Sequence, residues 1–164
     1  MKSLGLFRPY YSPEAYATPS KVAPASILIA EDDPEDRLLT IDALEDGQIE
    51  REVYFVEDGE ELMNYLKNRG PFGDPQAYPT PKLILLDLNM PRKDGREALK
   101  EIKRDPELCH IPVVVLTTSK AQDDIDRSYH LGVNSYITKP VSFSGLVEIM
   151  SSLSSYWFKT VELP

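Results

Sequence analysis

Acidic, hydroxyl and lysine side chains stand at the ends of apolar stretches in this chain, where a folded protein must find partners for them. The apolar run Leu83–Leu86 ends at Asp87, which would place a carboxylate at the edge of a buried strand. An unpaired buried carboxylate costs several kcal/mol, so this acid must be exposed, paired with a cation or bound to a metal. Other apolar stretches end in the same way, and the polar residues that close them are Glu31 and Asp32, Thr117, and Lys139.

If these ends meet, the side chains form a site suited to phosphoryl chemistry. Crowded carboxylates repel one another and raise each other's pKa, and a hard divalent cation that prefers oxygen ligands, such as Mg²⁺, relieves the repulsion. Lys139 supplies a second positive charge and Thr117 a hydroxyl. In such a site Asp87 can act as a nucleophile that forms an acyl phosphate, while the metal and the lysine neutralise the oxygens of the transferred group.

Strands and helices that alternate along the chain would bring the polar ends together. Apolar, β-branched runs predict strands, and helical spacing of apolar residues predicts helices. The strands are expected over 26–31, 52–57, 82–87, 111–118 and 134–138, and the helices over 34–46, 60–69, 96–105, 121–132 and 142–158. This order is typical of an α/β fold whose parallel sheet carries helices on both faces and binds ligands at the carboxyl ends of its strands.

The length of 164 residues fits one domain with some chain left over. Residues 1–25 are rich in proline and tyrosine and form an N-terminal arm, which either lies extended on a surface or is a disordered leader. The domain itself is expected over 26–155, followed by a C-terminal tail over 156–164. The chain beyond Pro140 has room for one helix and this tail, so no second domain is expected there.

Composition and charge exclude several classes of function. The net charge of −9 argues against nucleic acid as a direct partner, because a phosphate backbone requires a basic face. No apolar run approaches the roughly 18 residues of a transmembrane helix, and the N-terminus lacks the apolar core of a secretory signal, so no membrane partner is expected. The single cysteine, Cys109, excludes an internal disulfide and fits the reducing cytoplasm.

The segments that carry the polar residues together resemble a known family. ILIAEDD, LILLDLNMPRKDG, VVVLTT and YITKP occur in the order and with the separations of a receiver domain of the two-component response regulators. The resemblance covers about residues 26–155, and the combination is specific although each segment alone is a weak signal. It implies a flavodoxin-like, doubly wound, five-stranded parallel sheet of order 2-1-3-4-5 with five helices.

The resemblance also implies a role for each acid of the site. Asp87 would accept a phosphoryl group from a phosphohistidine on a sensor histidine kinase, and the chain would assist its own phosphotransfer and dephosphorylation without being an enzyme. Asp32 and Asp87 would ligate Mg²⁺ directly, with Mn²⁺ as a substitute. The main-chain carbonyl of Asn89 would be a further ligand, and Glu31 would act through water. No organic cofactor is expected.

Three further residues would act on the phosphoryl group and on the response. By the resemblance, Thr117 hydrogen-bonds a phosphoryl oxygen, Lys139 pairs with the group, and the bond between Lys139 and Pro140 is cis. Tyr136 matches the switch aromatic, which turns inward when the threonine moves; an ordinary half-buried strand tyrosine is the alternative. The response would be a population shift in the face formed by the fourth helix, fifth strand and fifth helix.

Three segments narrow the resemblance to the stand-alone regulators paired with phytochrome-type kinases, especially in cyanobacteria. They are the insertion RGPFGDPQAYPTP, the stretch DPELCHIPVVVLTTS and the ending SSYWFKTVELP. The implied input is red/far-red light through a kinase that carries the chromophore. The implied assembly is a homodimer through the region of the fourth helix, fifth strand and fifth helix and the C-terminal tail. Surplus apolar residues near the C-terminus agree with such an interface, and a tail packed on its own domain is the alternative.

Three other classes of function fit the residues less well. A haloacid-dehalogenase-type phosphatase needs a second acid two residues after its nucleophile, where this chain has Asn89. A flavodoxin-like cofactor binder needs a glycine- and hydroxyl-rich loop after the first strand, where EDDPED would repel phosphate. A constitutive, phosphorylation-independent binding module is the main rival, and it ranks lower because all the acceptor residues are present.

Overall fold

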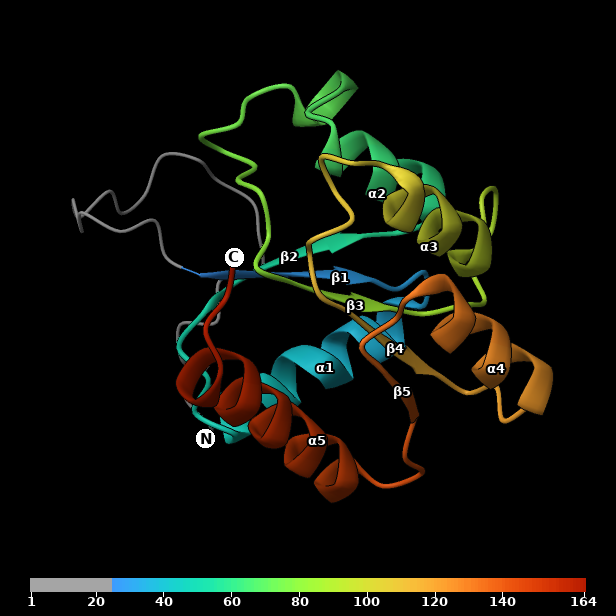
Figure 1. The fold of residues 1–164 in the computed structure, drawn as a ribbon. Helices are drawn as coiled ribbons and strands as arrows, with labels where there is room; N and C mark the ends of the chain where they lie inside the picture. Colours follow the sequence, from blue (N-terminus) through green and yellow to red (C-terminus); the bar gives the residue numbers. More distant parts are fainter. Residues whose placement is uncertain (1–24) are drawn as a thin grey trace.

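The computed structural model describes residues 25–164, so the predicted arm over 1–25 lies almost entirely outside the described residues. Within the described part, the parallel strands form one sheet in the order β2-β1-β3-β4-β5, which confirms the predicted fold (Figure 1). β1 pairs with both β2 and β3, so the strand order reverses between β1 and β3, where α/β folds of this kind bind ligands. The strands are β1 (Ser26–Ala30), β2 (Glu52–Val56), β3 (Leu83–Leu86), β4 (Val113–Thr117) and β5 (Ser135–Thr138).

Helices alternate with these strands, and capping aspartates fix where several of them begin. The first N–H groups of a helix have no partners within it. In α1, α2 and α3 the carboxylates of Asp33, Asp58 and Asp94 accept these groups. In the described part of the chain, no helix combines the length and the apolar character that crossing a membrane requires. The helices are α1 (Pro34–Asp46), α2 (Gly59–Leu66), α3 (Gly95–Arg104), α4 (Gln122–Leu131) and α5 (Phe143–Ser155).

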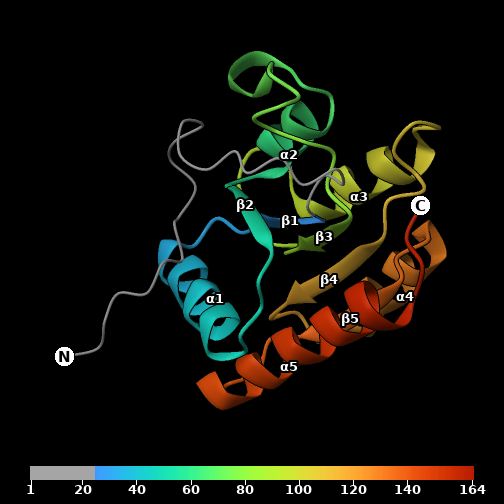
Figure 2. The same ribbon diagram turned by 90° about the vertical axis from the view of Figure 1, so that its left-hand side faces the viewer.

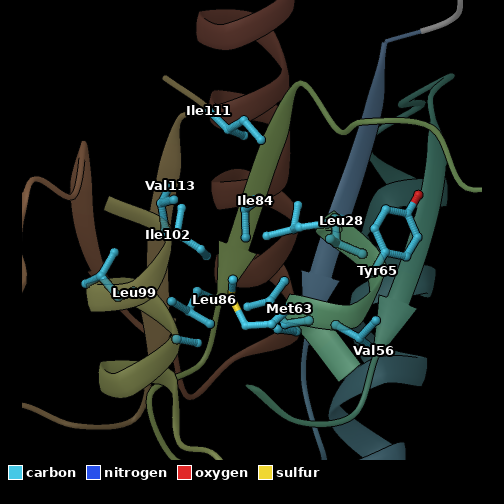
Figure 3. Close-up of a cluster of buried hydrophobic side chains, with 14 of the residues drawn as sticks. Leu28, Val56, Met63, Tyr65, Ile84, Leu86, Leu99, Ile102, Ile111 and Val113 are labelled. Carbon is cyan, nitrogen blue, oxygen red and sulfur yellow. The ribbon is translucent and has the colours of Figure 1, made fainter. Parts of the chain in front are cut away.

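The helices cover both faces of the sheet. α1 and α5 pack side by side on one face, whereas α2, α3 and α4 lie on the other (Figures 1 and 2). Alternate residues of β3 serve the two layers: Ile84 and Leu86 join the core under α2 and α3 (Figure 3), and Leu83 and Leu85 join the core under α1 and α5. Every residue of β3 is therefore buried, which explains its unbroken apolar run.

The C-terminal segment departs from the expected single helix over 142–158. α5 ends at Ser155, and one π-helical turn, η2 (Tyr156–Thr160), follows it. In this wider turn the consecutive residues Trp157 and Phe158 both pack against the core under α1 and α5. Part of the surplus apolar surface is thus buried within the domain, as expected if the tail packs on its own domain. The segment 70–81, where no helix or strand is expected, holds a short 3₁₀-helix, η1 (Gly70–Phe72).

The prediction of a cis bond before Pro140 is wrong. No peptide bond between described residues is cis. For a bond to proline the trans isomer is favoured by about 0.5–1 kcal/mol, so it forms unless the surroundings select the other isomer. Here the main-chain N–H of Lys139 donates to the carbonyl of Thr117 at 2.7 Å, so Lys139 lies at the edge of the sheet although its bond to Pro140 is trans.

Candidate functional site

Neighbouring strands deliver the predicted acids and the hydroxyl to one edge of the sheet. β1 and β3 pair with Ala30 opposite Leu86, so the residues that follow them emerge at the same level. The N–H of Asp87 continues the ladder by donating to the carbonyl of Ala30 at 3.1 Å. Thr117 closes β4 beside β3 and is fully buried. The parallel pairing therefore brings these strand ends together, as the alternation of elements predicts.

Three acids form a cluster that can hold a metal ion. Carboxylate oxygens of Glu31, Asp32 and Asp87 all lie within 4.8 Å of one another. Glu31 and Asp87 are buried, with 5% and 7% of their surfaces exposed, and Asp32 is partly exposed. Oxygen ligands of this kind suit hard divalent cations such as Mg²⁺ and Mn²⁺. The donor set thus fits the predicted metal, whereas softer metals prefer nitrogen or sulfur ligands.

Lys139 supplies positive charge to this cluster. Its Nζ donates to Glu31 Oε2 at 2.5 Å, to Asp36 Oδ2 at 2.8 Å and to Asp87 Oδ2 at 3.1 Å, which occupies all three of its N–H groups. Sequence analysis identified Lys139 but missed Asp36. The available signal was weak: Asp36 lies in the first turn of α1, soon after the acid pair, where an acid is also favoured for the helix alone.

Burial and charge shift the proton equilibria of the cluster. Burial raises the pKa of Glu31 to about 7, and the hydrogen bond and charge of Lys139 oppose this rise only in part. Burial alone would lower the pKa of Lys139, but its hydrogen bonds to Asp36 and Glu31 and the charge of Asp87 raise it above the usual value. Burial thus favours the protonated form of Glu31, whereas Lys139 and a cation bound in the cluster favour its ionised form.

The two oxygens of Asp87 have different surroundings. Oδ1 accepts the hydroxyl of Thr117 at 2.8 Å and the main-chain N–H of Asn89 at 3.1 Å, whereas Oδ2 accepts Lys139. The Asn89 contact folds the chain after β3 into a turn, which also carries the main-chain carbonyl predicted as a metal ligand. An oriented carboxylate with hydroxyl and ammonium donors beside it can attack an electrophilic phosphoryl group and stabilise its oxygens.

Tyr136 is tied to the loop that follows Thr117. Its hydroxyl donates to the main-chain carbonyl of Ser119 at 2.9 Å, its ring is partly buried in β5, and burial raises its pKa. Its main-chain N–H donates to the Tyr129 hydroxyl at 3.2 Å. These contacts place Tyr136 where movement of Thr117 could reach it, and its role as a switch stays a prediction. Sequence analysis did not identify Ser119 as its partner.

Several other residues with chemical potential lie outside the site. Asp33 directly follows the acid pair, but its carboxylate caps α1 by accepting the N–H groups of Glu35 and Asp36. Cys109, His110 and His130 are exposed and lie outside the acidic cluster. The chemistry of this edge therefore rests on Asp87 and its immediate partners.

Replacing Lys139 by methionine should destabilise the metal-free protein. The variant leaves a cluster of carboxylates without its bound cation, and breaking a largely buried pair of this kind costs about 3 kcal/mol. Mg²⁺ should recover part of this loss, because the ion supplies the missing charge. Urea unfolding with and without Mg²⁺ measures both effects.

Lys67 offers a matched control, because its ion pair with Asp105 is also partly buried but joins α2 to the end of α3 away from the acid cluster. Lys67→Met should cost about 1 kcal/mol or less and show no added recovery with Mg²⁺. Equal losses in the two variants would contradict the role given to Lys139.

Comparisons with known proteins identify chains that are similar over most of their length. Residues 27–151 match the family described as the response regulator receiver domain. The response regulator Rcp1 of Synechocystis sp. is 44% identical over 141 residues, which cover 86% of this chain and 94% of Rcp1. The solved structure of the phosphorylated cyanobacterial phytochrome response regulator RcpA gives a TM-score of 0.80 at 46% identity, covering 87% of this chain and 99% of RcpA. The solved structure of the Mn²⁺-bound form of Rcp1 gives a TM-score of 0.78 at 44% identity, covering 86% of this chain and 99% of that one.

Proposed function

Because the chain belongs to the response regulator receiver domain family, we propose that it is a single-domain response regulator that accepts a phosphoryl group on Asp87 from a histidine kinase. The contact set of Asp87 carries this proposal. Its carboxylate joins Glu31 and Asp32 in the acidic cluster, and Thr117 and Lys139 donate to its two oxygens. A strand-end cap would need none of the neighbouring acids, which repel it in the absence of a cation.

Transfer to Asp87 is a displacement at phosphorus. A carboxylate oxygen forms the new O–P bond, the P–N bond of the phosphohistidine breaks, and the imidazole keeps the electron pair of that bond. Lys139 and Thr117 already donate to the attacking carboxylate, so they lie within reach of the oxygens of the arriving group. Hydrolysis of the acyl phosphate restores Asp87. The chain thereby assists its own phosphorylation and dephosphorylation without acting on a separate substrate.

Mg²⁺ is the proposed cofactor, and Mn²⁺ can replace it. Asp32 and Asp87 would bind the ion directly, the Asn89 carbonyl would add a ligand from the turn after β3, and Glu31 would act through water. The bound ion would supply positive charge that neutralises phosphoryl oxygens. The oxygen-only donor set supports this assignment, and so does the similarity to Rcp1, whose structure is described as a Mn²⁺-bound form.

The direct test is to incubate the protein with acetyl phosphate, with and without Mg²⁺, and to record its intact mass. We expect a gain of one phosphoryl group that depends on Mg²⁺ and is reversed by hydroxylamine, which cleaves acyl phosphates. No gain under any condition would overturn the proposal in favour of a constitutive, phosphorylation-independent binding module.

A sensor histidine kinase of the phytochrome type is the proposed phosphodonor. The support is the similarity to RcpA, described as a phytochrome response regulator, along nearly the whole of that chain. Such a donor would place this chain in the cytoplasm. Transfer from an autophosphorylated cyanobacterial phytochrome kinase should be much faster than transfer from a histidine kinase without a chromophore-binding domain. Equal rates would remove the link to light.

We also propose a homodimer through α4, β5, α5 and the C-terminal tail. β5 lies at the edge of the described sheet, and a groove of about 790 Å³ runs between it and α5. Ile137, Ile149 and Trp157 contribute to its wall, and Tyr156, 52% exposed, lies at its rim. A second copy would cover this apolar surface, which a single domain leaves in water.

Tyr156→Asp should therefore shift the protein towards monomer in sedimentation while circular dichroism still shows a folded domain, because the tyrosine is half exposed. Leu38→Asp is the matched control, since Leu38 is 59% exposed on α1, outside the proposed interface. Dissociation by both variants, or by neither, would contradict an interface at this groove.

A further inference from the structure

An ion pair between α3 and α4 lies beside the acceptor site, and the functions assigned above do not use it. Arg96 Nε donates to Asp124 Oδ1 at 2.6 Å, and Nη2 donates to Oδ2 at 2.7 Å. Two parallel hydrogen bonds between a guanidinium and a carboxylate fix both position and angle. The pair is mostly buried, with 28% and 14% of the two side chains exposed. The hydrogen bonds from Arg96 and Ser119 lower the pKa of Asp124 to about 2, so the pair stays charged at neutral pH.

Each partner of this pair also holds one loop of the site. On one side, the hydroxyl of Ser119 donates to Asp124 Oδ2 at 2.6 Å, which holds the loop after β4. On the other side, Arg96 Nη1 makes longer contacts to the Leu88 carbonyl at 3.4 Å and to the Asn89 side-chain oxygen at 3.5 Å, in the turn after β3. The ion pair therefore connects the two loops that follow Asp87 and Thr117.

The connection extends to the predicted switch residue. Ser119, held through its hydroxyl by Asp124, offers its main-chain carbonyl to the hydroxyl of Tyr136. A displacement of Asp124 would move the acceptor to which Tyr136 is bonded. On the other side, a displacement of Arg96 would release contacts to the turn that carries the Asn89 carbonyl. One ion pair is thus linked both to the turn that carries a proposed metal ligand and, through Ser119, to the predicted switch residue.

We propose that Arg96 and Asp124 are positioning residues that clamp the loops after β3 and β4 together and thereby set the affinity for Mg²⁺ and the rate of phosphoryl acceptance. Only the effect on the rate of phosphoryl acceptance rests on the proposed function. Neither residue touches the reacting atoms. They act by positioning the metal ligands and the hydrogen-bond donors of the site. Shifts of about 1 Å in such groups change reaction rates strongly. Loss of a residue that holds a metal ligand lowers metal affinity about tenfold or more.

The test compares Arg96→Met, Asp124→Asn and the double variant with the wild type. Asparagine can still accept the Ser119 hydroxyl, so Asp124→Asn removes mainly the charge. Calorimetric titration with Mg²⁺ alone gives the dissociation constant, the mass gain with acetyl phosphate gives the initial rate, and amide hydrogen exchange over 118–122 reports the loop. We expect each single variant to weaken Mg²⁺ binding about tenfold, to slow phosphorylation and to speed exchange in that loop. The double variant should be no worse than either single one, because both break the same clamp.

The pair of Lys67 and Asp105 supplies the control, since 26% and 17% of its two side chains are exposed and it joins α2 to the end of α3. Lys67→Met and Asp105→Asn should lower stability about as much as the Arg96 and Asp124 variants do. They should leave the Mg²⁺ affinity and the hydrogen exchange over 118–122 unchanged. Unchanged affinity in the Arg96 and Asp124 variants, or fully additive losses in the double variant, would overturn the clamp. Failure of the wild type to take up phosphoryl would overturn the proposed function, while Mg²⁺ affinity and hydrogen exchange would still decide the clamp.

Discussion

Replacing Asp87 by asparagine should abolish the Mg²⁺-dependent gain of a phosphoryl group, because the variant lacks the carboxylate nucleophile. One side of the surroundings can be kept, because the amide oxygen of asparagine can accept the Thr117 hydroxyl and the Asn89 N–H that Asp87 now accepts. On the other side the amide NH2 group replaces the oxygen that accepts Lys139, which retains its contacts to Glu31 and Asp36. Loss of phosphorylation would then report chemistry and not misfolding. Intact mass after incubation with acetyl phosphate is the measurement, with circular dichroism to confirm the fold.

The same variant should lose the effect of the metal on stability without losing stability itself. In the wild type, Mg²⁺ at about a hundred times its dissociation constant should add about 2.7 kcal/mol to the free energy of unfolding. Asp87→Asn removes one member of a cluster of neighbouring carboxylates, which relieves repulsion, and Lys139 keeps its contacts to Glu31 and Asp36. Urea unfolding should therefore show a variant as stable as the metal-free wild type, with little further gain from Mg²⁺.

Asp33→Asn is the matched control for both measurements. Asp33 follows Glu31 and Asp32 in the chain, but its side chain caps α1, and asparagine caps a helix as well as aspartate does. This variant should keep both its phosphorylation and its stabilisation by Mg²⁺. Continued phosphorylation of Asp87→Asn would rule out Asp87 as the acceptor, and equal losses in both variants would show that the effect is not specific to Asp87.

The strand-end residues could be predicted from sequence because simple rules govern them. A strand buried on both faces reads as an unbroken apolar run, and its end can be located to within a residue or two, as at Leu86. Parallel strands point the same way, so residues that follow them share an edge. Asp87, Thr117 and Lys139 each belong to this class, and the structure brings them into direct contact.

Asp36 and Ser119 could not be predicted by these rules. The contact between Asp36 and Lys139 spans 103 positions along the chain and depends on how far two side chains reach between α1 and the loop after β5. The contact of Ser119 with Tyr136 uses a main-chain carbonyl, which every residue has, so residue type carries no signal. Strand periodicity determines which residues share an edge, but the reach of side chains and the path of loops decide which of them touch.

Gly95→Ala should be the most damaging substitution by a single methyl group near the site. Gly95 begins α3, and its N–H donates to the carbonyl of Leu88 at 2.9 Å, which draws the helix start against the turn after β3. A Cβ at this position would lie 2.7 Å from the Leu88 Cα and 2.9 Å from the carbonyl carbon of Asp87, and closer still to the Asp87 carbonyl oxygen. All of these are backbone atoms, so no side chain can rotate away to make room.

The sign of the effect follows from two opposing terms. Alanine in place of glycine within a helix stabilises by roughly 0.5–1 kcal/mol, because the unfolded chain has less freedom to lose. Forcing a methyl group into a filled space costs about 3 kcal/mol when the backbone itself must move. The net result should be a loss of about 2 kcal/mol in the free energy of unfolding.

The displacement falls on Asp87, so phosphorylation should suffer beyond the loss of stability. The rate of acetyl phosphate uptake should drop even at temperatures where Gly95→Ala is fully folded, because the backbone that presents the carboxylate has moved. Gly73→Ala is the control: its Cβ would meet only the Gly70 carbonyl oxygen at 3.3 Å and the Asn68 carbonyl oxygen at 4.0 Å. If Gly95→Ala is as stable and as readily phosphorylated as Gly73→Ala, the prediction is wrong. The turn after β3 can then move enough to accept a methyl group at position 95.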